Sequence, residues 1–276
     1  LSPHVLLHVV TGRQRKMFIW DRFNNINIEI QKTPLVKNPV HHYSILNSSN
    51  GKIGYLMYNQ FVSNYDQYLE SIFSEYKSNS VNELILDLRY NPGGSINSAL
   101  ILASLITGQF ENDIFNTEEW NTEIQNYWIN NNPEYLVNRF LSLESSLNLN
   151  RVFILTTRSS ASASELIINC LDPYIDVIQI GTTTYGKYQA SVTLYDSENF
   201  SNQNINPSHN YAIQPLVLKT LNVLGITDYF NGINPEYDFE EKVYNMGIIG
   251  DLNEPMLNFA MGLILSLIHI SEPTRP

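Results

Sequence analysis

Cysteine and basic side chains are scarce in this sequence, and both shortages narrow the range of functions. A single cysteine, Cys170, in 276 residues excludes an internal disulfide framework and a multi-cysteine metal site. Lysine and arginine together number 16 against 27 acidic residues, which gives a formal net charge of −11. Because phosphate backbones and anionic lipids attract clustered positive charge, we expect neither a nucleic acid nor a membrane surface as a partner.

Long hydrophobic runs and metal-ligand patterns are missing as well. No run reaches the ~18–20 apolar residues that a membrane span requires, since polar side chains interrupt the longest candidate, residues 256–270. The six histidines show no metal-ligand spacing, so we expect no metal and no cofactor. Cys170 lies on the apolar side of a predicted helix, and we interpret it as a buried structural thiol.

Both ends of the chain carry unusual features. It begins at Leu1 without a charged and then apolar signal segment, so we expect a fragment whose N-terminal part is missing. The run LSLIHISEPTR at residues 265–275 resembles the translation of a sequencing adapter. We therefore expect residues 265–276 to be extraneous to the fold, with an ordinary C-terminal tail as the alternative.

Strand and helix patterns alternate along the rest of the chain, which predicts a mixed α/β fold. Residues 26–30 alternate apolar and polar side chains, as a strand does. Prolines and then polar residues up to Gly51 indicate a boundary after this strand. We expect a short first unit over residues 1–45 and a main domain over residues 46–264.

Hydrophobic periodicity locates most elements of the main domain. A helix is predicted after a cap at Ser63 or Asn64, with one apolar face. That face consists of Leu69, Ile72, Phe73 and Tyr76. The other predicted strands are residues 53–58, 84–88, 152–156 and 177–180, and the other predicted helices are residues 96–106, 165–171 and 251–264. Aromatic residues between 115 and 150 indicate packed helical segments there.

Three loops, each after a predicted strand, contain residues that favour chemistry. Residues 87–94 read DLRYNPGG, whose paired glycines let backbone N–H groups approach a ligand at a helix N-terminus. Residues 159–165 read SSASASE, whose small side chains leave a serine hydroxyl accessible. Residues 181–187 read GTTTYGK and end on a lysine. Taken singly, a tight turn, a helix capping box and a solvent-facing lysine are the simpler explanations.

Taken together and in this order, the three loops resemble those of the C-terminal processing peptidases, also called tail-specific proteases. That family shows D-L-R-x-N-x-G-G, then S/T-A-S-A-S-E, then G-x-x-T-x-G-K, and its serine nucleophile precedes its lysine base by 25 residues. Ser162 and Lys187 are also 25 residues apart. Residues 225–229 and 232–236 are similar to late motifs of the Bacteroidetes-type members, so the resemblance covers about residues 52–263.

The resemblance implies a crotonase/protease-like ββα spiral, usually with a PDZ domain ahead of the catalytic core. Residues 1–45 would then be the tail of a truncated PDZ domain, or a linker. The implied activity is that of a serine endopeptidase that acts on protein or peptide substrates near their C-termini. The implied location is a bacterial cell envelope, either periplasmic or associated with the outer membrane.

The mechanism that the resemblance implies is a Ser/Lys dyad. Ser162 attacks the peptide carbonyl, and Lys187 takes its proton, which a lysine amine does only in its neutral form. We therefore expect Lys187 to be desolvated and next to Ser162. The backbone N–H of Ala163 and that of Gly93 or Gly94 would form the oxyanion hole.

The third catalytic group is less well defined. The family usually has glutamine four residues after the lysine, where this chain has Ser191. Glu165 is either a third member of the site or a helix cap. The alternatives for the whole chain are a non-catalytic ligand- or peptide-binding protein on the same fold and a crotonase-type acyl-CoA enzyme. The intact Ser162 and Lys187 argue against the first, and the lack of a basic cluster for a nucleotide argues against the second.

Overall fold

The computed structural model describes residues 16–20, 27–31, 37–49 and 51–267. The chain divides into two units, Leu1–Asn38 and Pro39–Pro276. In the first unit, β1 (Lys16–Trp20) and β2 (Asn27–Gln31) form an antiparallel hairpin with Lys16 opposite Gln31. The hairpin confirms a strand close to the expected residues 26–30, but it does not identify a PDZ domain.

The second unit begins at Pro39, earlier than the sequence patterns indicate. Strand β3 (Val40–Ser48) pairs antiparallel with β4 (Gly51–Tyr58), so residues 40–45 belong to the main sheet. Of the polar residues that suggested a domain boundary, Asn47 and Ser48 end β3, and Gly51, with a φ of +133°, begins β4. Strand β3 therefore runs across the expected boundary after residue 45, because the same polar residues occur in hairpins and in linkers.

A six-stranded sheet forms the centre of the second unit, in the order β14-β9-β8-β5-β4-β3. Neighbouring strands run parallel except β4 and β3. The remaining strands are β5 (Val81–Asp87), β8 (Arg151–Thr156), β9 (Asp176–Gly181) and β14 (Tyr237–Asp238). Strands β4, β5, β8 and β9 confirm the four strands that the sequence predicted for this part of the chain.

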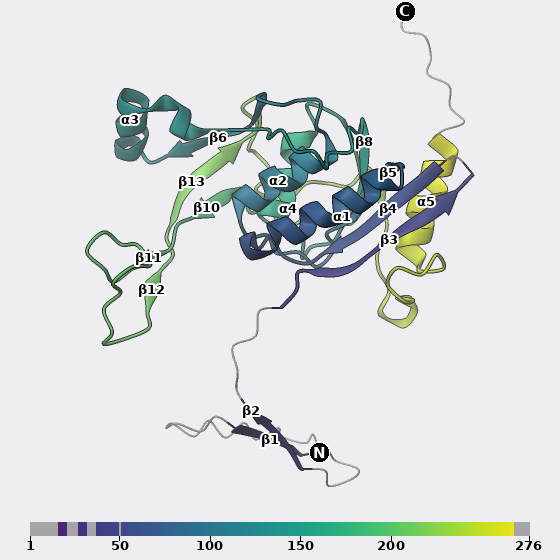
Figure 1. Ribbon diagram of the computed structural model, residues 1–276, viewed down its shortest axis with the longest axis horizontal. Coiled ribbons are helices and arrows are strands. Elements are labelled where there is room, and N and C mark those ends of the chain that lie inside the picture. Colours follow the sequence, from purple (N-terminus) through teal and green to yellow (C-terminus); the bar gives the residue numbers. More distant parts are fainter. Residues whose placement is uncertain (1–15, 21–26, 32–36, 50, 268–276) are drawn as a thin grey trace, which may run out of the picture. The chain divides into compact units, whose positions relative to one another are not determined.

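Helices cover both faces of this sheet and produce three layers (Figure 1). One layer contains α1 (Asp66–Ser78), α2 (Ile96–Ile106) and α4 (Ala163–Leu171), and the opposite layer contains α5 (Pro255–Leu267). Such a parallel sheet between helical layers is the arrangement that alternating strand and helix patterns favour.

The sequence of β4 shows how one strand serves both layers. Successive side chains of a strand point to opposite faces of the sheet. Ile53, Tyr55 and Met57 are buried in the core that includes α5. Leu56 and Tyr58 are buried in the core that includes α1, α2 and α4.

Helix α1 has the apolar face that its spacing predicts. Its buried residues are Leu69, Ile72, Phe73 and Tyr76. Its start differs from the expectation, since Tyr65 is the N-cap residue and not Ser63 or Asn64. The expected cap is wrong because a 3-10 turn (Ser63–Tyr65) takes up these polar residues before the helix begins.

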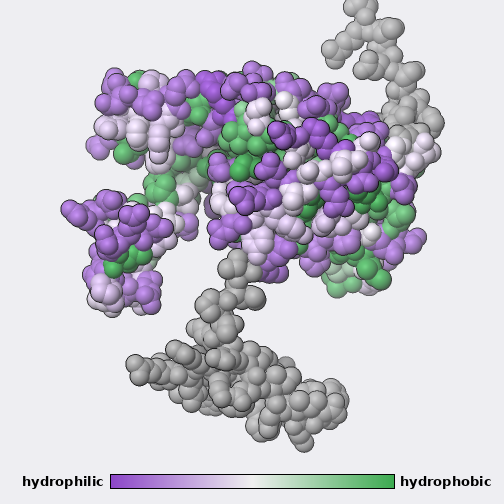
Figure 2. All heavy atoms as spheres, viewed as in Figure 1, coloured by the Kyte–Doolittle hydropathy of each residue, from purple (hydrophilic) through white to green (hydrophobic). Residues whose placement is uncertain are grey.

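A second, four-stranded sheet is antiparallel, in the order β10-β13-β6-β7. Its strands are β6 (Ile114–Trp120), β7 (Val137–Arg139), β10 (Gln189–Ser191) and β13 (Leu216–Leu221). It extends from the layered core towards α3 (Thr122–Asn131) and the hairpin of β11 (Leu194–Tyr195) and β12 (Ala212–Ile213) (Figure 1). Hydrophilic side chains cover much of the visible face, and hydrophobic areas lie over the layered core and on that hairpin (Figure 2).

The expectation of helices across residues 115–150 is only partly right. Helix α3 and a short 3-10 helix (Pro133–Leu136) are present, but Trp120 lies in β6. β6 pairs with β13, which comes far later in the chain. Strand formation there depends on this distant pairing, so the local sequence gave no sign of it.

The last described segment contains a 3-10 helix (Val243–Asn245) and α5. Pro255 is the first residue of α5, a position where proline is well tolerated, and the helix begins later than the expected residue 251. Residues 265–267, expected to be extraneous, continue this helix, and the rest of 265–276 lies outside the described residues. In the described part of the chain, no helix has the length and hydropathy needed to cross a membrane.

Replacing Leu69 by alanine should lower the free energy of unfolding by ~2–5 kcal/mol, because Leu69 is fully buried between α1 and the sheet. Ser74→Ala, on the exposed side of the same helix, should change it by less than ~0.5 kcal/mol. Urea denaturation followed by circular dichroism measures both values. Equal stability of the two variants would contradict the packing of α1.

Candidate active site

The three loops singled out from the sequence meet at the carboxyl ends of β5, β8 and β9, which are adjacent in the main sheet. The carboxyl ends of neighbouring parallel strands share one edge of a sheet, where ligand sites of such folds commonly lie. Backbone hydrogen bonds join the loops: Ala161 N–H donates to Asn91 O at 3.0 Å, and Tyr185 N–H donates to Ser160 O at 3.0 Å. We call them the glycine, serine and lysine loops.

Gly93 brings the glycine loop into contact with the serine loop. It has a φ of +103°, and a Cβ on it would lie 2.6 Å from Ser162 Cβ and 2.9 Å from Ala163 N. Glycine permits both the positive φ and this close approach. The N–H of Gly93 donates to Asn91 Oδ1 at 2.8 Å and is therefore occupied.

Two nearby backbone N–H groups, those of Gly94 and Ala163, have no hydrogen-bond acceptor within the described residues. Gly94 has a φ of +145°, and a Cβ there would overlap the carbonyl oxygen of Phe61. Ala163 is the first residue of α4, where N–H groups lack a partner inside the helix. Of the two glycines, Gly93 makes the contact with Ser162, and Gly94 has the available N–H.

Ser162 occupies the N-cap position of α4 with φ 59° and ψ −113°. A residue other than glycine rarely adopts such a conformation, which costs on the order of 1–3 kcal/mol and is found mostly at functional sites. The side chain of Ser162 is partly exposed, so a ligand can reach it.

The neighbouring serines are buried and bonded to the glycine loop. Ser160 Oγ donates to Leu88 O at 2.8 Å, and Ser164 Oγ donates to Asn91 O at 2.9 Å. Ser164 lies in the first turn of α4, as expected. These two hydroxyl groups attach the serine loop to the glycine loop.

Glu165, which is fully buried, connects the serine loop to the lysine loop. Its Oε2 accepts from the backbone N–H of Ser162 at 2.8 Å and from that of Lys187 at 2.8 Å. Its Oε1 accepts from the Thr184 hydroxyl at 2.6 Å and from Gly186 N–H at 2.5 Å. Glu165 thus caps the start of α4 through the N–H of Ser162, as a capping box requires of its glutamate, and the same carboxylate also binds the lysine loop.

The shared oxygen places Ser162 and Lys187 close together. Because Oε2 of Glu165 binds both N–H groups, the two backbone nitrogens lie within about 6 Å of each other. The side chain of Lys187, however, is exposed. The expected desolvation of Lys187 is therefore wrong for this structure, because Glu165 fixes only the backbone of the lysine loop and the side chain extends into solvent.

Ser191, the residue at the family's glutamine position, is not part of this group. It lies in β10 opposite Leu216 of β13. Among the described residues, no hydrogen bond joins its side chain to Ser162, Lys187 or Glu165.

Asn91 holds the glycine loop in place, although the sequence analysis did not single it out. It is fully buried, its Nδ2 donates to Tyr58 O at 2.8 Å, and its Oδ1 accepts from Gly93 N–H. Asparagine side chains in turns commonly bond the backbone two residues later. Its place directly before Pro92 was therefore a usable signal.

Thr184 plays the corresponding part in the lysine loop. Its hydroxyl donates to Glu165, and the same oxygen accepts from Ile233 N–H at 2.7 Å. It is one of three consecutive threonines, Thr182 to Thr184, and the sequence does not distinguish it from the other two.

Arg89, at the start of the glycine loop, is fully buried among three carboxylates. The contacts are 2.8 Å to Asp87, 2.7 Å to Glu241 and 3.0 Å to Glu254. Burial alone would lower the pKa of Arg89, but these carboxylates, with Asp87 foremost, raise it above its ordinary value. Glu254 also accepts from Leu257 N–H at 2.7 Å, so the network fastens the end of β5 to the start of α5.

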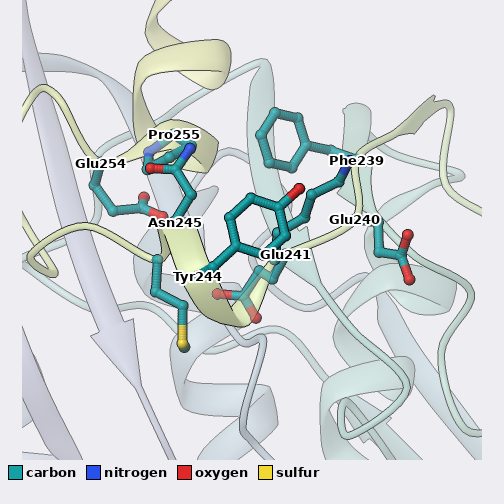
Figure 3. Close-up of a pocket in the computed structure, with 9 residues that line it drawn as sticks. Phe239, Glu240, Glu241, Tyr244, Asn245, Glu254 and Pro255 are labelled. Atoms are coloured by element: carbon teal, nitrogen blue, oxygen red, sulfur yellow. The ribbon is translucent and has the colours of Figure 1, made fainter.

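A pocket of about 320 Å³ lies beside this network, because Glu241 and Glu254 line it (Figure 3). Ser162 is not among its lining residues. It is lined by residues of segment 239–246 together with Glu254 and Pro255. The lining contains no serine, threonine, cysteine or histidine. At its edge Glu241 accepts from the Tyr90 hydroxyl at 2.8 Å, and burial together with Glu241 raises the pKa of Tyr90.

Cys170 lies in α4 and is fully buried. Burial raises the pKa of its thiol, which keeps the reactive thiolate scarce at neutral pH. The interpretation of Cys170 as a structural thiol is confirmed.

Comparison with known proteins identifies the family of this chain. A sequence model described as "Peptidase family S41" matches residues 52–206, and the chain belongs to that family. The CtpA-like serine protease of Staphylococcus epidermidis is 28% identical over 151 residues, which are 55% of this chain and 28% of that protein. The carboxyl-terminal-processing protease of a Picosynechococcus species is 25% identical over 161 residues, 58% of this chain and 35% of that protein. The chain thus spans about a third, or less, of the length of these relatives.

Solved structures agree with this membership. An S41 protease from Bacteroides fragilis has a TM-score of 0.72 and 27% identity, over 91% of this chain and 66% of that chain. The photosystem II D1 C-terminal processing protease has a TM-score of 0.58 over 86% of this chain and 56% of that chain, and at 16% identity it supports the fold alone. The mixed α/β fold and the resemblance to C-terminal processing peptidases are confirmed.

Replacing Glu165 by glutamine should lower the free energy of unfolding by ~1–3 kcal/mol, because an amide NH₂ would face N–H groups that now donate to a carboxylate oxygen. The backbone amides of Gly186 and Lys187 should exchange with deuterium faster, since they lose their acceptor. Glu144→Gln, at an exposed position, is the matched control and should leave both readouts unchanged. Unchanged exchange at Gly186 and Lys187 in Glu165→Gln would contradict this role of the carboxylate.

Proposed function

We propose that this chain is the catalytic domain of a serine endopeptidase that hydrolyses peptide bonds with a Ser162–Lys187 dyad. The observation that carries the proposal is the single oxygen of Glu165 that accepts from the backbone N–H groups of both residues. Membership of a peptidase family supports the reaction class. The strained backbone of Ser162 and its contact with Gly93 support its role as nucleophile.

In the proposed first step, Ser162 Oγ attacks the peptide carbonyl carbon while the neutral Nζ of Lys187 takes the hydroxyl proton. The carbonyl oxygen becomes an oxyanion, which the N–H groups of Ala163 and Gly94 stabilise, while Gly93 provides room for the close approach. Lys187 then gives the proton to the leaving amine as the C–N bond breaks, and an ester remains on Ser162. Lys187 next takes a proton from a water, whose oxygen attacks the ester carbonyl carbon. The bond from that carbon to Ser162 Oγ then breaks, Lys187 returns the proton to Oγ, and the product leaves as a carboxylic acid.

Substrate binding would supply the desolvation that Lys187 lacks here. An exposed amine is stabilised in its charged form by water, and a charged amine cannot accept a proton. An extended peptide that lies over the lysine loop would exclude water from Nζ and favour the neutral amine. The exposed side chain of Lys187 is therefore compatible with catalysis in the substrate complex.

We assign Glu165 a positioning role and not a proton-transfer role. An ionised carboxylate offers about four lone-pair sites. Four donors already occupy those of Glu165, from Ser162, Thr184, Gly186 and Lys187. No acceptor site is then left for a proton from the dyad, and Ser191 has no part in this proposal.

The substrate class and the location follow from the relatives. One of them is named for carboxyl-terminal processing, so we infer cleavage of protein substrates near their C-termini. The named relatives are bacterial, and a bacterial cell envelope is the location we infer. For residues 1–45 we infer either the tail of a truncated PDZ domain or a linker. A non-catalytic binding protein on the same fold is the alternative, and it would bind peptides without cleaving them.

Ser162→Ala and Lys187→Ala should each abolish cleavage of a labelled protein such as fluorescein-casein, because each removes one member of the dyad. The double variant should be no less active than either single variant, since the two residues act as a unit. Circular dichroism checks that the fold is kept. Near wild-type cleavage by either single variant would refute the assignment.

The matched controls are Ser160→Ala and Ser164→Ala, which remove hydroxyls from the same loop. They should retain most of the activity while losing ~1–3 kcal/mol of stability, because each leaves a buried carbonyl of the glycine loop unpaired. A fluorophosphonate label that maps to Ser160 or Ser164 with Ser162 unmodified would place the nucleophile elsewhere.

A comparison of wild type with Lys187→Arg over a range of pH tests the assigned base, because only a neutral amine accepts the proton of Ser162. Lys187→Arg should be inactive at every pH tested, since a guanidinium group stays protonated. Initial rates over a pH series, at substrate concentrations below saturation, measure both proteins. Cleavage by Lys187→Arg would mean that the residue contributes only its charge.

A further inference from the structure

Arg158 directly precedes the serine loop, four residues before Ser162, and its guanidinium group contacts the lysine loop. Its Nη1 donates to the backbone carbonyls of Thr184 at 2.6 Å and Asn231 at 3.2 Å. Its Cζ lies 5.6 Å from the centre of the Tyr185 ring, which is a cation–π contact. Thr184 and Tyr185 belong to the lysine loop, so Arg158 spans from the nucleophile's loop to the loop of the proposed base.

Arg158 differs from the other arginines of the described residues in having no carboxylate partner. Arg89, Arg139 and Arg151 each form an ion pair with aspartate or glutamate. Arg158 forms none, although acidic residues exceed basic ones by 11 in this chain. Its side chain is exposed, so its unpaired charge faces solvent at the site.

The free part of the guanidinium group has the shape that a carboxylate requires. Nη1 carries two N–H groups, and two backbone carbonyls accept from it. Nε and Nη2 have no acceptor within the described residues. Their N–H groups lie on one side of the planar group, and two parallel N–H donors are the usual partner of a carboxylate.

We propose that Arg158 binds a carboxylate of the peptide substrate and so determines which peptides the site accepts. The carboxylate is either the C-terminal α-carboxylate or the side chain of aspartate or glutamate, and both offer the same pair of oxygens. This inference rests on the proposed peptidase function and adds a specificity-determining residue to it. Because Arg158 is held by the lysine loop, it would fix the distance between that carboxylate and the bond that is cleaved.

The test uses three matched libraries of fluorescence-quenched octapeptides with the full chain. The first has amidated C-termini and lacks aspartate and glutamate, so it carries no carboxylate and is the neutral library. The second differs from it only in free C-termini, and the third differs from it only in containing aspartate and glutamate. Wild type should cleave at least one of the two carboxylate-bearing libraries about tenfold better in kcat/KM than the neutral library, the gain expected from a charge-assisted hydrogen bond. The second library tests the α-carboxylate, and the third tests the side chains.

Arg158→Gln should remove this preference, mainly through a higher KM for the carboxylate-bearing library, and should lower cleavage of the neutral library much less. Arg158→Lys should restore it in part, since lysine supplies the charge but not the paired donors. The control is Arg139→Gln, which removes an exposed arginine of β7 paired with Glu134, and it should keep the wild-type preference. Equal losses on charged and neutral libraries in Arg158→Gln would reduce Arg158 to a tether between loops and overturn the proposal.

A binding measurement separates this proposal from the proposed function. Fluorescence anisotropy with Ser162→Ala, which needs no turnover, should show tighter binding of the carboxylate-bearing octapeptides, and Arg158→Gln on that background should abolish the difference. If wild type cleaves nothing while this difference persists, the peptidase function fails and the carboxylate site stands. If wild type cleaves all libraries equally, or binding shows no difference, the peptidase function is unaffected and the carboxylate site is refuted.

Discussion

The carboxylate of Glu165 is the interaction on which the site depends. A buried negative charge is unstable unless donors surround it, and here the donors come from two different loops. The lysine loop can therefore satisfy Glu165 only in the position where Gly186 and Lys187 present their N–H groups to it. The same requirement holds Ser162, whose N–H donates to the carboxylate while its backbone adopts a strained conformation. Burial of one charge thus sets the relative position of the two loops.

Arg89, in the glycine loop, is also a buried charge whose partners fix the position of a loop. One guanidinium group stands against three carboxylates, so further donors are needed to balance the excess negative charge. Tyr55 donates its hydroxyl to Asp87 at 2.7 Å, and Glu254 accepts from the start of α5, where a helix favours negative charge. Such a network adds little net stability because of its desolvation cost, but it fixes geometry. The D-L-R part of the motif therefore supports the site without lying in it.

Local patterns in the sequence predicted the elements whose stability is local. The spacing of Leu69 and its neighbours predicted the buried face of α1, and the paired glycines predicted a loop with room for a close approach, which Gly93 makes to Ser162. Other contacts join segments that are far apart in the chain, such as β6 with β13 and Thr184 with Ile233 N–H. The hairpin between β3 and β4 contains turn residues that also occur in linkers. No periodicity records such contacts. The exposure of Lys187 escaped prediction for another reason: the chemistry requires a neutral amine in the substrate complex, whereas the structure describes the chain alone.

Arg158 contributes one positive charge next to the site, and hydrogen bonds to two backbone carbonyls hold its guanidinium group in place. A chain with a net charge of −11 repels anionic peptides at long range, so recognition of a carboxylate has to come from a short-range contact. Arg158 is suited to this because Thr184 accepts from it through the backbone carbonyl and donates to Glu165 through the hydroxyl. The carboxylate that aligns Ser162 and Lys187 therefore also sets the position of Arg158, through a single intermediate residue. Glu165 would therefore position both the residues that cleave the peptide and the residue that binds its carboxylate. A shift of the lysine loop would disturb cleavage and carboxylate binding together.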